Sequence, residues 1–141
     1  MAMLKKILAP TDFSELSAEG VRYACHLAKD TGAQVIVLNV IVLDESNTTT
    51  KREMEQHNRR LEEFVAKTAN HRADLKIRAV VVAGQPYGAI IDCAENEKVD
   101  LIVLSTHGRG GLSRMLIGSV TDKLLRGATC PVLVVPAGGK G

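Results

Sequence analysis

The sequence has no tryptophan, and all aromatic residues together make up 3% of its 141 residues. Proteins that bind single-stranded nucleic acids stack bases on aromatic side chains, and this chain has too few for such a surface. An excess of one charge is also missing, because 18 basic and 16 acidic residues leave a formal net charge of +2 without a basic block. The composition therefore argues against a nucleic-acid partner and against binding to a charged membrane surface.

Long apolar runs and paired cysteines are missing as well. No apolar run approaches the roughly 18 residues that span a bilayer, and the apolar stretch in the first residues, MAMLKKILAPTDF, is too short for a secretory signal. The three cysteines, Cys25, Cys93 and Cys130, are odd in number and far apart, as is typical of reduced thiols in a cytosol. We therefore expect a cytoplasmic protein. The histidines and cysteines lack metal-ligand spacing, so we expect no metal site built from protein ligands alone.

What the sequence does contain is an alternation of strand and helix patterns. Near-continuous apolar runs predict buried parallel strands, and one run that alternates with Lys and Arg predicts an edge strand. The strands are expected at 4–10, 34–43, 75–81, 100–105 and 131–136. The helices are expected in the gaps: one that ends before Gly32, one over 51–72, one that opens at Pro86 and one over 119–128.

This order predicts an α/β fold, a doubly wound parallel sheet in a single domain over 1–141, without internal repeats or a linker. Ligands of such sheets bind beyond the carboxyl ends of the strands, where the strand order reverses. The candidate floor of a site is therefore formed by three strand tips: Pro10 to Asp12, Asn39 to Ile41, and the residues from Ser105 onward.

Residues 105–119, STHGRGGLSRMLIGS, contain two points with little side chain. The first is Gly108, and the second is the pair Gly118 and Ser119, with nine residues between them. Neither common phosphate loop fits, because there is no Walker-type Gly-Lys pair and no dinucleotide fingerprint after the first strand. Glycine lets backbone approach a ligand, and a helix that begins at 119 offers free N–H groups to an anion. The two points therefore predict a cradle for a phosphate chain.

A second interpretation needs no ligand. Ser119 with Asp122 three residues later fits a helix-capping pattern, and glycines also mark loops that bind nothing. From spacing alone, both interpretations of the loop stay open.

Five segments, in this order along the chain, resemble the universal stress protein family, in its ATP-binding branch. They are KILAPTDFSE, VIVLNVI, GQPYGAII, DLIVLSTHGRGGLSRMLIGSV and CPVLVVP, and together they cover nearly the whole chain. The family's nucleotide loop has the pattern Gly-x-x-Gly-x9-Gly-Ser/Thr. This chain departs from it at Ser105, where glycine is usual. Because serine is small, we expect the site to survive.

The resemblance implies a Rossmann-like, five-stranded parallel sheet with strand order 3-2-1-4-5 that binds an adenine nucleotide, ATP. Asp12 is expected against the ribose or adenine, and Pro10, Thr11 and Val40 are expected to wall the adenine. The residues expected to bind the phosphates are Gly108, Arg109, Gly118, Ser119 and Val120. The residues implied to bind the nucleotide are Pro10, Thr11, Asp12, Val40, Leu104, Ser105, Thr106, His107, Gly108, Arg109, Gly118, Ser119, Val120 and Thr121. Any Mg²⁺ is expected to be held through the phosphates, near Asp12.

The implied function is that of a nucleotide-dependent regulatory binding module of the stress response. A slow ATPase or phosphotransferase and a nucleotide-free dimeric scaffold are the alternatives. No activated nucleophile is evident in the sequence, which weighs against an enzyme, and the intact Gly118–Ser119 pair weighs against an empty scaffold. At single residues simpler roles stay open: Val40 as core, and Asp12 as a cap of the first helix or of the turn before it.

The last strand, Pro131–Pro136, is expected at a sheet edge, where an exposed apolar strand pairs with a second copy of the chain. The resemblance also implies a homodimer through this strand. The alternative is a monomer in which the two prolines protect the edge.

Overall fold

The computed structural model describes residues 4–43, 48–69, 74–107 and 114–137. Strands and helices alternate in the order β1 (Lys6–Pro10), α1 (Glu15–Thr31), β2 (Gln34–Val42), α2 (Lys51–Thr68), β3 (Lys76–Gly84), α3 (Pro86–Asn96), β4 (Leu101–His107), α4 (Arg114–Gly127) and β5 (Val132–Ala137). The five strands form one sheet in the order β3-β2-β1-β4-β5, and every neighbouring pair is parallel. The predicted fold class and strand order 3-2-1-4-5 are confirmed.

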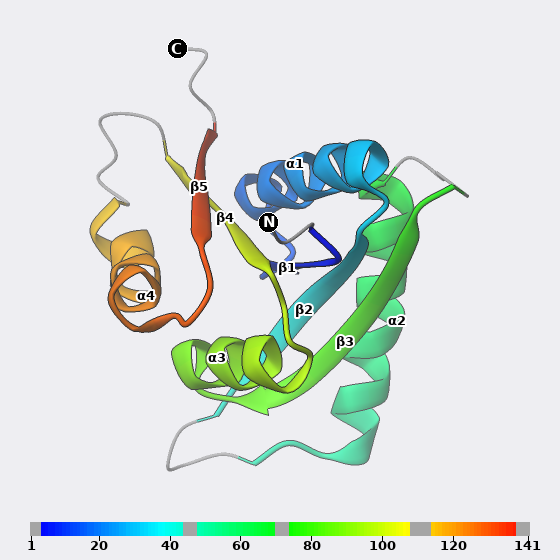
Figure 1. The fold of residues 1–141 in the computed structure, drawn as a ribbon. Helices are drawn as coiled ribbons and strands as arrows, with labels where there is room; N and C mark the ends of the chain where they lie inside the picture. Colours follow the sequence, from blue (N-terminus) through cyan, green and yellow to red (C-terminus); the bar gives the residue numbers. More distant parts are fainter. Residues whose placement is uncertain (1–3, 44–47, 70–73, 108–113, 138–141) are drawn as a thin grey trace.

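Two helices cover each face of the sheet (Figure 1). Alternate side chains of the central strands enter two separate cores, because successive residues of a strand point to opposite faces. In β1, Ile7 belongs to the core under α1 and α2, and Leu8 to the core under α3 and α4. The continuous apolar runs of the sequence therefore reflect strands that are buried on both sides.

Local signals set several helix ends. Ser14 caps α1, and its side chain accepts a hydrogen bond from the Ser17 N–H. Gly32 ends the same helix in the left-handed conformation, with φ of 77°, which glycine adopts without steric cost. Pro86 opens α3, where its missing N–H has no helical partner to lose. The predicted roles of Gly32 and Pro86 are confirmed.

The predicted start of the last helix is wrong. We expected it at 119, but α4 begins at Arg114. The residues RMLI before Gly118 are mostly strong helix formers, so the helix extends across a glycine that costs it only about 1 kcal/mol. Gly118 and Ser119 therefore lie in the second turn of α4.

The positions of the edges matter for assembly. The sheet ends in β3 on one side and in β5 on the other (Figure 1), as expected for both strands. Within the described residues, no helix is both long enough and apolar enough to cross a membrane.

Candidate functional site

A pocket of about 420 Å³ opens at the carboxyl ends of β1, β2 and β4. The strand order reverses between β1 and β4, which is the position where doubly wound sheets bind ligands. The predicted residues that line it are Pro10, Thr11, Asp12, Val40, Leu104, Ser105, Val120 and Thr121. Residues that lie far apart in the sequence are thus brought to one cavity.

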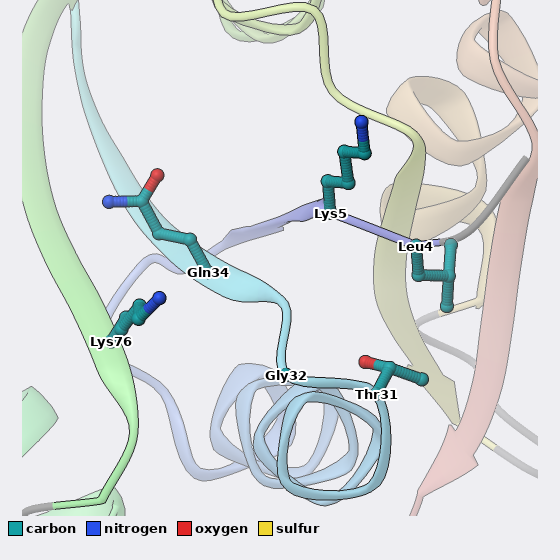
Figure 2. A pocket seen from close by; sticks show the side chains of 6 residues that line it. All are labelled: Leu4, Lys5, Thr31, Gly32, Gln34 and Lys76. Atoms are coloured by element: carbon teal, nitrogen blue, oxygen red, sulfur yellow. The ribbon is translucent and has the colours of Figure 1, made fainter.

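A second pocket, of about 430 Å³, lies at the opposite edge of the sheet. Figure 2 shows its side chains on the segment before β1, the end of α1, and the starts of β2 and β3. Lys5 and Lys76 supply positive charge there, but the carboxyl end of α1 presents the negative end of a helix dipole. Among the described helices none begins at this edge, so it offers no free helix N–H groups of the kind that favour anions. The carboxyl-edge pocket is therefore the stronger candidate.

The polar side of the carboxyl-edge pocket is the turn from β1 into α1. Thr11 is 6% exposed; its Oγ1 lies 2.6 Å from Ser17 Oγ and accepts a hydrogen bond of 2.9 Å from the Phe13 N–H. Asp12 Oδ1 accepts one of 3.0 Å from the Ser14 N–H. Side chains therefore satisfy the backbone of this turn and fix its shape.

Asp12 has the structural role in the turn that the sequence left open, and it also lies in the pocket wall. It stabilises the turn that precedes α1 through its bond with Ser14, and it lines the pocket. Partial burial raises the pKa of Asp12, but hydrogen bonds to Ser14 and Ser17 outweigh burial, so the net pKa lies below its usual value. The side chain is consequently a carboxylate at neutral pH and can accept hydrogen bonds from ligand hydroxyl groups.

The opposite side of the pocket is apolar. Val40 lines it and also packs against the core under α3 and α4, so the core role considered for this residue is confirmed and its side chain also reaches the pocket. The pocket is further lined by Val42, Pro86 and Ile90. The Leu43 N–H donates to Gly84 O at 3.1 Å, and Gln85 Nε2 donates to the Leu43 carbonyl. These bonds hold the end of β2 against the start of α3.

Sequence reasoning missed several lining residues: Ser14, Leu16, Ser17, Leu38, Val42, Pro86 and Ile90. A signal existed for some of them. The first turn of α1 directly follows the tip of β1, and α3 begins directly after β3, so both helix starts had to lie at the carboxyl edge.

Ser105 has an unusual environment. Its Oγ is buried and has no hydrogen-bond partner among the described residues. It faces α1 at Gly20, where an added Cβ would lie only 2.5 Å from Ser105 Oγ. The serine that replaces the expected glycine therefore fits because the facing helix residue has no side chain.

The structure does not place the other predicted residues in the lining of the pocket. Thr106 and Ser119 do not line it, and His107 ends β4. Gly118 lies inside α4, so its N–H is not one of the free groups of a helix start. Gly108 and Arg109 fall outside the described residues.

The chain is thus a doubly wound α/β protein with a pocket at the switch point of its sheet and the carboxylate of Asp12 in the turn after β1. The universal stress protein family model matches residues 3–136, and the chain belongs to this family. Universal stress protein MJ0531 of Methanocaldococcus jannaschii is 33% identical, with 94% of this chain and 82% of that protein covered. Universal stress protein MJ0577 of the same organism is 32% identical, over 94% and 95%.

Solved structures agree with the fold. The structure of MJ0577 superposes with a TM-score of 0.72 at 33% identity, covering 99% of this chain and 100% of that one. A universal stress protein in complex with cAMP superposes with a TM-score of 0.76, covering 96% and 98%. At 23% identity the latter comparison supports the shared fold alone.

Proposed function

We propose that this universal stress protein binds an adenine nucleotide, with ATP as its ligand, and acts as a nucleotide-dependent regulatory module in the stress response. The observation that carries the proposal is the pocket at the strand-order reversal, which combines an apolar side with the polar turn around Asp12. Its volume of about 420 Å³ lies in the range of about 300–1,000 Å³ that is typical of small-molecule sites.

The two sides of the pocket suit different parts of the ligand. The apolar residues Val40, Ile90 and Leu104 offer the dry surface that a purine ring prefers. The Asp12 carboxylate suits the ribose hydroxyls, which are hydrogen-bond donors. In this arrangement the phosphates extend toward Val120 and Thr121 on α4, next to the glycine-containing segment that the sequence predicts as their cradle.

The chemistry of the lining favours binding over catalysis. Asp12 is the one carboxylate among the described lining residues, and groups of three potential metal ligands are not found in the part of the chain that the structure describes. Any Mg²⁺ would arrive with the nucleotide and be held mainly by its phosphates, because a single carboxylate is a poor metal site.

Isothermal titration calorimetry tests the proposal with ATP, AMP and cAMP as separate ligands. Val40→Phe adds a large side chain to the apolar side of the pocket, and we expect ATP affinity to fall at least about tenfold, or about 1.4 kcal/mol. Val82→Phe is the matched control, because Val82 pairs with Val40 in the sheet but does not line the pocket. A wild-type protein that binds none of the three ligands would contradict the proposal.

A further inference from the structure

A buried polar residue links α2 to the turn beside the pocket. Asn39 is 4% exposed, and its Nδ2 donates a 3.0 Å hydrogen bond to the Thr11 carbonyl. On its other side, Asn39 Oδ1 lies 3.0 Å from Nδ1 of His57. Because a carbonyl oxygen only accepts, His57 must carry its hydrogen on Nδ1. The arrangement is a relay from helix to amide to turn.

The Asn39 side chain lies just beyond the last paired residues of β1 and β2. The pairing of β1 with β2 stops at Pro10 and Leu38, followed by a 2.8 Å bond from the Thr11 N–H to Leu38 O. The next acceptor, the Thr11 carbonyl, receives its hydrogen bond from the side chain of Asn39 and not from backbone. A side-chain amide thus continues the ladder by one bond, to the residue that precedes Asp12.

A second contact from α2 reaches the other side of Asp12. The His57 ring lies 6.0 Å from the ring of Phe13, between centroids. The guanidinium of Arg60 lies 4.2 Å from the Phe13 ring centre. Phe13 has φ of 72°, a backbone conformation that is unfavourable for a bulky residue and persists only when its surroundings hold it. Two residues that flank Asp12 are therefore held from one helix.

Helix α2 itself contributes no described residue to the pocket. We propose that His57 is a positioning residue for the nucleotide: through its hydrogen bond with Asn39 it keeps the Thr11–Ser14 turn in the shape that presents Asp12 to the ligand. This inference rests on the proposed function, since it concerns binding at the same pocket. A turn that is ordered before binding spares the ligand the entropic cost of ordering it.

Two substitutions separate the two contacts of His57. His57→Phe keeps a ring against Phe13 but removes the donor to Asn39. His57→Asn removes the ring but keeps an N–H donor on the same carbon, Cγ, and should rescue. Gln56→Phe is the matched control, because Gln56 is exposed on the same helix. Should His57→Phe fail to fold, His57→Ala is used in its place, because the smaller side chain lets water hydrogen-bond to Asn39 Oδ1.

The first measurement is made without nucleotide. Hydrogen exchange monitors the N–H groups of Phe13 and Ser14, which donate to Thr11 Oγ1 and Asp12 Oδ1. We expect exchange at 11–14 to be about fivefold faster in His57→Phe, the factor that corresponds to the net contribution of one hydrogen bond. We expect wild-type rates in His57→Asn and Gln56→Phe. Unchanged exchange in a folded His57→Phe, or an equal acceleration over the whole chain, would overturn the inference.

The second measurement is ATP affinity by calorimetry on the same four proteins. We expect about fivefold weaker binding in His57→Phe and recovery in His57→Asn. Faster exchange of the turn at wild-type ATP affinity would refute a positioning role. If the wild type binds no nucleotide, the proposed function fails and the inference fails with it, whereas a wild type that binds and a His57→Phe variant that binds equally well refute the inference alone.

Discussion

The contact between Gly20 and Ser105 allows a quantitative test of how α1 packs on β4. An alanine at position 20 would place its Cβ 2.5 Å from Ser105 Oγ, while the next nearest atoms, of Leu104 and Ser105 backbone, lie at 3.4 Å. Overpacking costs about 1–3 kcal/mol, and replacing a helical glycine by alanine gains about 1 kcal/mol. We therefore expect Gly20→Ala to lower the free energy of unfolding by about 0–2 kcal/mol.

Removing the opposing oxygen should reverse this loss. Ser105→Ala deletes a buried hydroxyl that has no partner among the described residues, so it should leave stability unchanged or raise it. In the double variant the remaining contacts of the new Cβ are ordinary, at 3.4 Å, and only the helix-propensity gain should remain. The coupling between the two substitutions should be about 1–3 kcal/mol.

Urea unfolding followed by circular dichroism measures all four proteins of this cycle. Independent sites add to within about 0.3–0.5 kcal/mol, so additivity within that range would refute the packing argument. It would mean that Ser105 Oγ rotates away from α1 at little cost. Unchanged slopes of the unfolding curves are required as a control, because a changed slope indicates an altered denatured state.

Three further predictions concern the site and the assembly. Asp12→Ala should weaken ATP binding about tenfold, since a charged hydrogen bond contributes about 1.5–3 kcal/mol and partial exposure reduces this. The same substitution should also lower stability at neutral pH. Because the folded-state pKa of Asp12 lies below its usual value, the difference from wild type should vanish as the pH falls through that lowered pKa, and acid-unfolding curves measure this. Gly118→Val should reduce ATP affinity at least about tenfold if the backbone of this residue contacts phosphate. Normal ATP affinity of a folded variant in calorimetry would mean that the Gly118 N–H is bonded within α4 and does not bind phosphate. Light scattering should find two 15.2 kDa chains per particle, and Val134→Lys on β5 should yield monomers; a monomeric wild type at micromolar concentration would contradict pairing through Pro131–Pro136.

The strands, several helix ends and the location of the site could be predicted from the sequence alone. The continuous apolar runs of β1, β2 and β4 indicate strands buried on both faces, and Gly32 and Pro86 mark helix ends through their own backbone geometry. Parallel strands share one carboxyl edge, so the tips at Thr11, Val40 and Ser105 had to lie near one another. These properties are local or follow from topology, which is why residue patterns suffice to predict them.

Features that depend on contacts between separate helices and strands were decided by the tertiary structure. The fit of Ser105 against Gly20 and the relay from His57 through Asn39 each join residues on separate elements. Periodicity shows that a face is buried but not which neighbour covers it, because that choice is made by packing between elements distant in the chain. The pocket owes its shape to these contacts.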